Sequence, residues 1–427
     1  MLSAGHIARK ESIVERSYES DASLMRRATG PLSEHLGAFV DLLTQQHFAV
    51  ATVYVKTLYA VAFDRWLVRH HVRLVDLNEI HIQRFSRRRR RGPIRLKTRR
   101  QEECDVKQVL SFLQLRGVCA KAVVSSTPAE DLVAAYVLHL RVQQGLASTT
   151  IERYAAVVQR FLAQRFGAGP VDLRAIVATD IIEFVRSEAA RIQPPAVKCV
   201  VNAMRSFLRY GQYRGSVASE LVAAVPAVSV WTSTPPLPRA ISAEHARRAI
   251  GGCNVATAIG LRNRAILLIL AQLGLRAGEI GALRLEDCDW DEGHLRVRGK
   301  GGRECLLPMP DDVGRAVAAY LERGRPVSSD RHLFLRSKAP IRGLTHGSDG
   351  IGSIVRSALV RARVDAPHRG SHQFRHALAM RMLRGGASFA EIGEVLRHRS
   401  PQTTSIYARV DLDALRPLAL PWPGGAR

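Results

Sequence analysis

The sequence lacks long hydrophobic runs and paired cysteines. Its longest strongly apolar stretch, residues 265–275, contains Gln272 and is far shorter than the ~20 residues that span a bilayer. The first residues, MLSAGHIARKESIVERS, include no apolar segment of the kind found in secretory signals. The six cysteines are scattered singly, which predicts small core residues in a reducing compartment and argues against a disulfide framework or a zinc site. We therefore expect a cytoplasmic protein with no membrane partner.

Acidic residues are also scarce. The 427 residues include 63 Lys and Arg against 38 Asp and Glu, a formal net charge of +25. With 46% hydrophobic and 24% charged residues, the composition is that of a folded protein, which excludes wholesale disorder. Such a charge opposes compaction unless an anionic partner neutralises it, and nucleic acid is the leading candidate for that partner.

The pattern of prolines and apolar residues predicts the domain organisation. The stretch PAVSVWTSTPPLP, residues 226–238, contains four prolines and reads as an extended linker. Before it, apolar residues recur at spacings of three and four, as in Leu36, Phe39, Val40 and Leu43, which predicts helices. We expect these parts: a helical unit at 1–125 with a basic loop at 87–100, a helical domain at 126–225, a linker at 226–239, a mixed domain at 240–411 and a tail at 412–427.

The first two of these parts resemble each other. At an offset of about 95 residues, three aromatic and apolar residues of the first part fall on similar ones of the second. The matched residues are Tyr59, Trp66 and Leu67 with Tyr154, Phe161 and Leu162, and, one gap later, Leu77, Ile80 and Phe85 with Leu173, Ile176 and Phe184. Short amphipathic patterns also coincide by chance, but the match predicts two related helical units at roughly 30–120 and 126–222.

A run of five arginines marks the first part: Arg87, Arg88, Arg89, Arg90 and Arg91. Residues 51–100 hold 14 Lys and Arg against 3 Asp and Glu, so this segment carries +11 of the net charge. A solvated loop would tolerate such a run. Phosphates would in addition relieve the repulsion among the arginines and release counterions, so we expect the run to contact a DNA backbone.

Residues after the linker read as a mixture of helices and strands. Ser242 is placed to cap a helix that starts at Ala243, and an apolar helix is expected from Arg264 towards Leu275. Polar and apolar residues then alternate on both sides of GKGG, which predicts a β-hairpin with Leu295, Val297, Cys305 and Leu307 on one face. Further helices are expected at 352–364, 372–385, 388–397 and 401–409.

Four short segments of this half carry reactive side chains. They are GLRAGEI with Arg276 and Glu279, VRGKGGR with Lys300, HQFRH with His372 and Arg375, and LRHRSPQTTSIYARV with His398 and Tyr407. In this order they resemble the tyrosine recombinase, or phage integrase, family over about residues 240–411. Residues 126–222 resemble that family's helical core-binding domain less specifically. The resemblance implies a mainly α fold with a small antiparallel β-sheet, in which helical core-binding (SAM-like) N-terminal domains precede a mixed α/β catalytic domain.

The resemblance implies a DNA phosphodiester as the target of this set. Arg276 and Arg375 would each present paired N–H donors to phosphate oxygens and stabilise the charge that builds on a five-coordinate phosphorus. Glu279 would orient Arg276 through a salt bridge. Two arginines with histidines can replace a metal electrostatically, so neither a metal nor another cofactor is expected.

The remaining residues would move protons and form the covalent bond. Tyr407 would attack the phosphorus and, because a phenol has a pKa near ~10, His372 would assist its deprotonation. Lys300, on the hairpin turn, would protonate the leaving 5′ oxygen. His398 would hydrogen-bond a phosphate oxygen. The product would be a 3′-phosphotyrosyl link that conserves the bond energy for rejoining.

Three details depart from the family pattern or admit another reading. Phe374 stands where leucine is more usual, and Arg397 stands where glycine commonly precedes the histidine, which would place one more charge near the DNA. His372 and His376 have the spacing of a metal-binding pair, but the glutamate of a zinc-protease motif is absent and no third ligand is evident.

The hypothesis with most support is a nucleoid-associated recombinase of the kind carried on mobile elements, and the sequence leaves integration, transposition, resolution of chromosome dimers and inversion of a segment as alternative roles. The resemblance implies a homo-tetramer on two double-stranded DNA sites, or an assembly that also includes related recombinase subunits. We expect the tail to dock on a neighbouring protomer. The alternatives are a DNA-binding protein of the same fold that does not cut alone and a topoisomerase of related chemistry.

Overall fold

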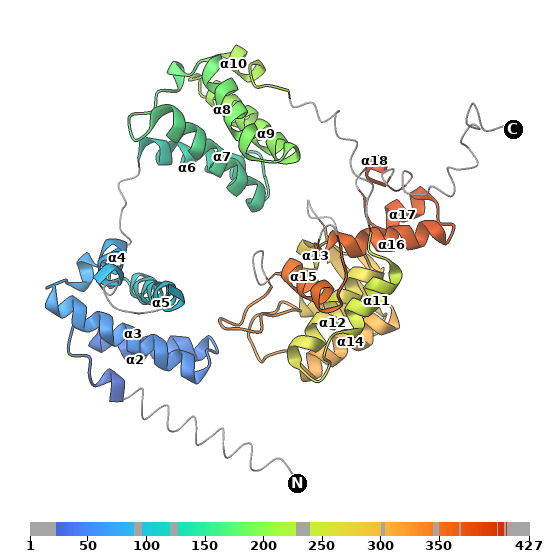
Figure 1. Ribbon diagram of the computed structural model, residues 1–427, viewed down its shortest axis with the longest axis horizontal. Coiled ribbons are helices and arrows are strands. Elements are labelled where there is room, and N and C mark those ends of the chain that lie inside the picture. The colour runs from blue at the N-terminus through green and yellow to red at the C-terminus, as the bar shows by residue number, and fades with distance from the viewer. Residues whose placement is uncertain are drawn as a thin grey trace, which may run out of the picture. The chain divides into compact units, whose positions relative to one another are not determined.

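The computed structural model describes residues 23–88, 96–119, 127–227, 240–299, 304–344, 350–366, 369–398, 400–404 and 407 (Figure 1). Residues Ala120–Pro235 form one compact unit, and Met1–Cys119 with Pro236–Arg427 form the other. The expected boundary at 125 and 126, most of the linker and the whole tail lie outside the described residues. No described helix is both long and apolar enough to cross a membrane.

The N-terminal helices enclose a core of their own. They are α2 (Ser33–Gln45), α3 (Val50–Arg69), a 3-10 turn η1 (Leu74–Asp76), α4 (Glu79–Arg88) and α5 (Leu96–Leu115). Phe39 and Trp66 are buried among leucines and valines of these helices. The carboxylate of Asp64, also buried, accepts hydrogen bonds from the backbone amides of Gly30 and Leu32, both at 2.8 Å. These bonds attach the segment before α2 to α3.

A second group of helices has its own core in residues 127–227. It comprises α6 (Pro128–Val142), α7 (Ser148–Phe166), a 3-10 turn η3 (Leu173–Ala175), α8 (Ala178–Arg191), α9 (Pro194–Tyr213) and α10 (Ser219–Ala223). Thr127 and Glu130 start α6 through a reciprocal capping box, in which each side chain bonds the backbone N–H of the other. The core is built around Tyr136, Phe161 and Phe207.

Both groups contain two helices, a 3-10 turn and two further helices in this order, and the second group adds the short helix α10. Trp66 and Phe161, paired by the sequence, are both buried. The expected pairing of Leu77 with Leu173 and of Ile80 with Ile176 is wrong by three residues. Leu77 directly follows η1 as Ile176 follows η3, while Ile80 is 56% exposed. More residues separate Phe161 from η3 than separate Trp66 from η1. The pairing made from the sequence inserted too few residues into the first unit to allow for this difference.

The part expected to be catalytic, described here from residue 240 to 407 and called the catalytic part, combines helices with a three-stranded antiparallel sheet whose strands lie side by side in chain order. Its helices are α11 (Ala243–Gly251), α12 (Ala258–Gln272), α13 (Ala277–Ala282), the 3-10 turn η4 (Leu285–Asp287), α14 (Asp311–Arg323), α15 (Ile351–Arg361), α16 (His372–Arg384), α17 (Phe389–Val395) and α18 (Pro401–Thr404). Its strands are β1 (Cys288–Asp289), β2 (His294–Arg298) and β3 (Glu304–Pro308). The mainly helical fold with a small antiparallel sheet is confirmed.

The hairpin predicted from alternation is present. Leu295 pairs with Leu307 and Val297 with Cys305. Leu295 and Val297 are buried against the helices. The sequence did not predict β1, because its two residues are too few for an alternating pattern.

Helix starts follow their capping residues. Ser242 caps α11 as expected, since its hydroxyl accepts the His245 amide at 3.1 Å. α12 starts six residues before the predicted Arg264, because the Thr257 hydroxyl accepts the amide of Gly260 at 3.1 Å. The apolar residues of α12 form the centre of the catalytic core.

All six cysteines are free, and one of them corrects a prediction. Cys119, Cys253 and Cys288 are buried, but Cys104 is exposed and is therefore not a core residue. It lies on α5, where an exposed position tolerates a small side chain of any polarity.

Candidate active site

Arg276 and Glu279 form an ion pair at the start of α13, and this pair is one side of the site. The backbone amide of Arg276 donates to Glu279 Oε2 at 2.9 Å, and Arg276 Nη1 donates to Oε1 at 2.7 Å. Burial acts to raise the pKa of Glu279, but the hydrogen bonds from Arg276 and the charges of Arg397 and Arg276 lower it overall. Glu279 is therefore ionised, and it holds the half-exposed guanidinium of Arg276 in one orientation.

Arg397, in the loop after α17, contacts both members of this ion pair. Its Nη2 donates to Glu279 Oε2 at 3.0 Å, and its carbonyl accepts a bond from Arg276 Nη2 at 3.4 Å. Its φ is +53°, a conformation that favours glycine, which explains why glycine is common at this place. The side chain is only 16% exposed, so the charge that the sequence assigned to the DNA face is paired with Glu279 instead.

Arg375 on α16 is buried and connects two loops. Its guanidinium donates to the carbonyls of Gly274, just before Arg276, and of Leu396, just before Arg397. Gly274 has φ +59°, and a Cβ there would lie 2.8 Å from a methyl group of Leu396, so only glycine fits. Burial and the charges of Arg276 and Arg397 lower the pKa of Arg375 to about 10, at which it is still a cation at neutral pH.

Tyr407 is buried, and its hydroxyl contacts His376. His376 Nδ1 lies 2.9 Å from Tyr407 Oη, and the two rings meet nearly edge to face at 5.6 Å. Burial raises the pKa of Tyr407, although the charge of Arg375 opposes this. The sequence predicted His372 as the partner of Tyr407 and considered His376 only as a metal ligand. The spacing of two histidines on one helix face was a signal that could have identified His376.

His398 and His372 flank this pair. His398 Nδ1 lies 2.7 Å from the Thr404 hydroxyl, and its ring is nearly parallel to that of Tyr407, with centroids 6.4 Å apart. His372, the first residue of α16, is exposed, and its ring centroid lies 6.3 Å from that of His376. Within the described residues His372 has no hydrogen bond to Tyr407.

The pKa values of all three histidines are lowered. Partial burial, followed by the charges of Arg375, Arg276, His376 and Arg397, lowers the pKa of His398 to about 4. Desolvation and the charges of Arg375 and Arg276 lower the pKa of His372. Desolvation, then the charges of His372 and Arg375, lower the pKa of His376. The rings are therefore mainly neutral at pH 7, and each neutral ring has one nitrogen that can accept a proton or a hydrogen bond.

These shifts predict that acid destabilises the fold. The pKa of His398 is about 4 in the folded chain and has its ordinary value in the unfolded chain. At pH values between these two, His398 is protonated in the unfolded chain and neutral in the folded chain. The free energy of unfolding therefore falls as the pH falls through this range. Urea unfolding between pH 7 and 5 should therefore show a smaller loss of stability for His398→Asn than for the unchanged chain. Equal losses in the two proteins would contradict this assignment.

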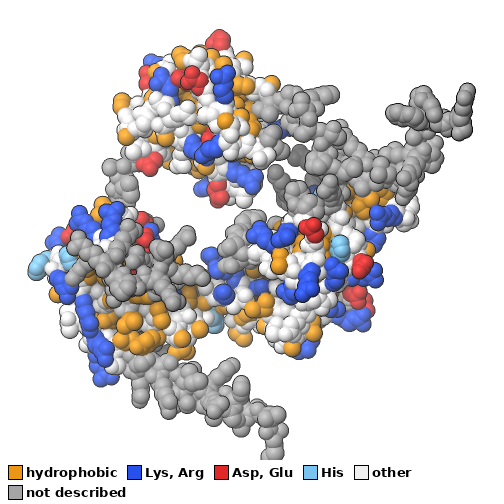
Figure 2. Space-filling view, viewed as in Figure 1, with side chains coloured by type: hydrophobic (Ala, Val, Ile, Leu, Met, Phe, Trp, Pro, Cys, Tyr) orange, Lys and Arg blue, Asp and Glu red, His pale blue; other side chains and the backbone are white. Residues whose placement is uncertain are grey.

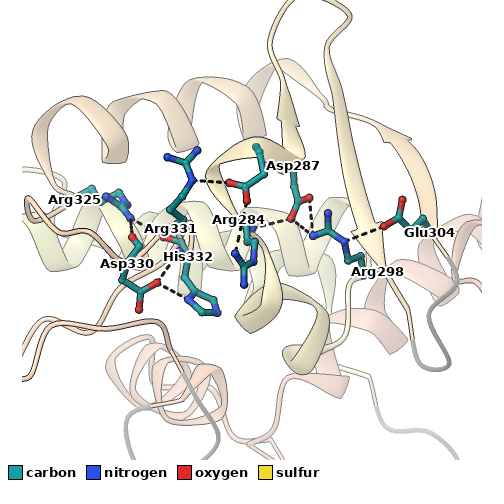
Figure 3. Close-up of polar contacts among 9 residues, drawn as sticks. Arg284, Asp287, Arg298, Glu304, Arg325, Asp330, Arg331 and His332 are labelled. Atoms are coloured by element: carbon teal, nitrogen blue, oxygen red, sulfur yellow. Dashed lines mark hydrogen bonds and ion pairs between the residues drawn. The ribbon is translucent and has the colours of Figure 1, made fainter.

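The hairpin that carries Lys300 is anchored at its base (Figure 3). Arg298, the last residue of β2, donates to the buried carboxylate of Asp287 at 3.0 Å and to Glu304 of β3 at 3.0 Å. Asp287 also accepts the backbone amide of Arg284 at 2.8 Å. Arg298 thus links both strands to η4 close to the point where the described part of β2 ends.

Several predicted residues fall outside the part of the chain that the structure describes: Lys300, Arg89, Arg90 and Arg91. Arg87 is exposed at the C-terminal end of α4, and Arg88 is the last residue of that helix. Lys and Arg side chains are prominent on the visible face of the catalytic part (Figure 2). Among the described residues, no group of three or more His, Cys, Asp and Glu is arranged to hold a metal ion.

The structure brings six predicted residues together in one array: Arg276, Glu279, His372, Arg375, His398 and Tyr407. Sequence reasoning missed His376 and the pairing of Arg397 with Glu279. The array combines two arginines, three neutral histidines and one tyrosine hydroxyl. Such a set can bind one phosphate diester and attack it with an oxygen nucleophile.

Comparisons with known proteins agree with this chemistry. Residues 240–413 match the model of the phage integrase family. The chain is 44% identical over 411 residues to putative integrase/recombinase y4rA of Sinorhizobium fredii, covering 96% of this chain and 98% of the relative. It is 30% identical over 305 residues to tyrosine recombinase XerD of Mycobacterium tuberculosis, covering 68% of this chain and 95% of the relative.

A solved structure shares the fold. The post-cleavage complex of XerH site-specific recombinase with a palindromic difH substrate has a TM-score of 0.53 and 18% identity, and covers 68% of this chain and 84% of that one. The relatives, the family model and the assembled array lead to one conclusion. The chain belongs to the phage integrase family of tyrosine recombinases, enzymes that cleave and rejoin DNA in site-specific recombination.

Proposed function

We propose that this recombinase cleaves double-stranded DNA through a 3′-phosphotyrosyl bond to Tyr407. The observation that carries the proposal is the position of the Tyr407 hydroxyl in one array with Arg375 and His398. Tyrosine is the only one of these side chains with an oxygen nucleophile. The arginines and histidines around it supply positive charge and hydrogen-bond donors for a phosphate.

Arg276 and Arg375 bind the scissile phosphate in this proposal. Glu279 and the two backbone carbonyls bonded to Arg375 hold the guanidiniums before DNA arrives, so little reorganisation is needed in the transition state. Each arginine has five N–H donors, so donors remain for phosphate oxygens after these internal bonds are made. The cation–phosphate contacts replace a metal, and no nucleotide cofactor is needed.

Leaving-group chemistry completes the step. The bond from phosphorus to the 5′ oxygen breaks as the bond to Tyr407 Oη forms. We assign Lys300 the transfer of a proton to that 5′ oxygen and His398 a hydrogen bond to a phosphate oxygen. His372, exposed beside His376, is assigned a supporting contact to the DNA. The reverse reaction, with the 5′ hydroxyl of a partner strand, rejoins the DNA.

DNA binding and assembly are part of the proposal. The net charge of +25 suits a duplex, and we assign the arginines 87–91 to contacts with its backbone. XerH, which shares the fold, was solved on a DNA substrate. We propose a homo-tetramer on two DNA sites, or an assembly that also includes related recombinase subunits, acting on the nucleoid in the cytoplasm. Residues 1–125 and 126–225 are assigned to DNA binding, 226–239 to a linker, 240–411 to catalysis and 412–427 to contacts between protomers.

The test is covalent attachment without metal. The purified chain is incubated in EDTA with supercoiled DNA that carries the flanks of its own gene, and products are separated under denaturing conditions. We expect protein joined to a 3′ DNA end, with a free 5′ hydroxyl opposite it. Salt-sensitive binding without any adduct would instead support the alternative, a DNA-binding protein that does not cut alone.

A further inference from the structure

His376 is the one described side chain that hydrogen-bonds the hydroxyl of Tyr407. The bond joins Nδ1 to Oη at 2.9 Å, and the hydroxyl is buried, so water does not replace it. Sequence and family resemblance pointed to His372 for this place. His372 lies one turn earlier on the same helix, with its ring 6.3 Å from that of His376.

The tyrosine already lies inside the catalytic array in this arrangement. His398 stacks nearly parallel to its ring, and the charge of Arg375 acts on its hydroxyl. An inhibitory contact, or latch, in which His376 kept Tyr407 out of the site would instead hold the tyrosine apart from His398 and Arg375. The contact with His376 is therefore made within the array of predicted catalytic residues.

On this basis, and resting on the proposed function, we propose that His376 is the general base that accepts the proton of Tyr407 during cleavage. The O–H bond of Tyr407 breaks and an N–H bond forms at His376 Nδ1, while Oη bonds to phosphorus. The 5′ oxygen departs with a proton from Lys300. During rejoining Lys300 takes back a proton from the attacking 5′ hydroxyl and the imidazolium returns its proton to Tyr407, so the enzyme ends with its original protons.

Charges around His376 support this role. The groups facing it are His372 and Arg375 on its own helix and Tyr407 and His398 from the segment after α17. Desolvation and the charges of His372 and Arg375 lower the pKa of His376, so its ring is neutral and ready to accept a proton. A DNA phosphate at Arg375 would offset the positive charge there and raise the basicity of the ring. The base would thus become strong enough only when substrate is bound.

The test compares variants that separate proton transfer from hydrogen bonding. In His376→Asn the amide oxygen can still accept a hydrogen bond near the Nδ1 position but cannot take the proton; His376→Ala removes both functions. Single-turnover adduct formation is measured from pH 6 to 10 on one DNA, with His372→Asn as the matched control on the same helix face. Thermal melting and DNA affinity establish that each variant is folded and binds.

We expect both His376 variants to form the adduct about 100-fold more slowly at pH 7, the lower range for general base catalysis. The deficit should shrink as the pH rises towards 10, because a growing fraction of Tyr407 is then ionised without His376, although its raised pKa keeps that fraction a minority. Added imidazole should partly restore His376→Ala. The His372→Asn deficit should not depend on pH in this way.

Three results would overturn the inference while leaving the proposed function intact. Faster cleavage by His376→Ala would show that the contact is a latch. Full activity of His376→Asn would show that a hydrogen bond suffices. A pH-dependent decrease in the rate of adduct formation in His372→Asn alone would show that His372 is the general base. Failure of the unchanged protein to form any adduct would instead overturn the proposed function.

Discussion

Tyr407→Phe should abolish the covalent protein–DNA adduct while DNA affinity stays within about twofold. The substitution removes one oxygen, which is both the nucleophile and the partner of His376. The phenyl ring can keep the buried position and the stacking on His398. Loss of a buried hydrogen bond should cost about 1 kcal/mol of stability, too little to unfold the domain. Denaturing electrophoresis of DNA labelled near the cleavage site measures the adduct directly.

The matched control is Tyr320→Phe. Tyr320 is another buried tyrosine of the catalytic part, and its hydroxyl accepts the Leu335 amide at 3.2 Å. This variant should lose similar stability and keep the adduct. An adduct that persists in Tyr407→Phe would mean that another nucleophile attacks the DNA.

Arg375→Lys should slow cleavage about 100- to 1000-fold with little change in DNA affinity. Lysine preserves the charge but lacks the planar fork that bonds two carbonyls while facing a phosphate. Losing one preorganised donor typically costs ~2.7 to 4 kcal/mol in the transition state, which corresponds to this range. Single-turnover cleavage on a saturating DNA concentration separates this effect from binding.

Arg262→Lys controls for the structural part of that change. Arg262 is also buried, and its guanidinium donates to the Leu335 carbonyl at 2.9 Å, outside the array around Tyr407. It should lower the melting temperature without slowing cleavage by the folded protein. A comparable loss of cleavage in both variants would indicate that Arg375 acts through stability alone.

Local patterns in the sequence were sufficient for much of the fold. Alternation predicted the pairing of Leu295 with Leu307, and Ser242 predicted the start of α11, because both depend on near neighbours in the chain. The start of α12 was misplaced because its cap, Thr257, precedes the apolar run by several residues. The repeat was paired incorrectly at Leu77 and Ile80, because the length of the loop before the 3-10 turn leaves no apolar pattern to count. The pairing of Phe85 with Phe184 agrees with the structure, since both are buried on the first helix after that turn.

For the candidate site as well, some features could be predicted from the sequence and others could not. The motifs were enough to select Arg276, His372, Arg375, His398 and Tyr407, because a phosphate and a nucleophile require particular side chains. They could not show that Arg397 would turn back to Glu279, since that contact joins residues 118 positions apart. Nor could they show which of two histidines on one helix face would reach the tyrosine.

The sequence by itself determined the chemistry available to this protein: strong positive charge, two arginines for a phosphate, two histidines and one tyrosine nucleophile in family order. Only the tertiary structure decided which side chains share hydrogen bonds. Buried Arg375 ties the turn at Gly274 to the loop at Leu396, and helix α16 presents His376 to the hydroxyl of Tyr407. Side-chain type follows from the sequence alone, whereas a contact of about 3 Å depends on how distant segments pack.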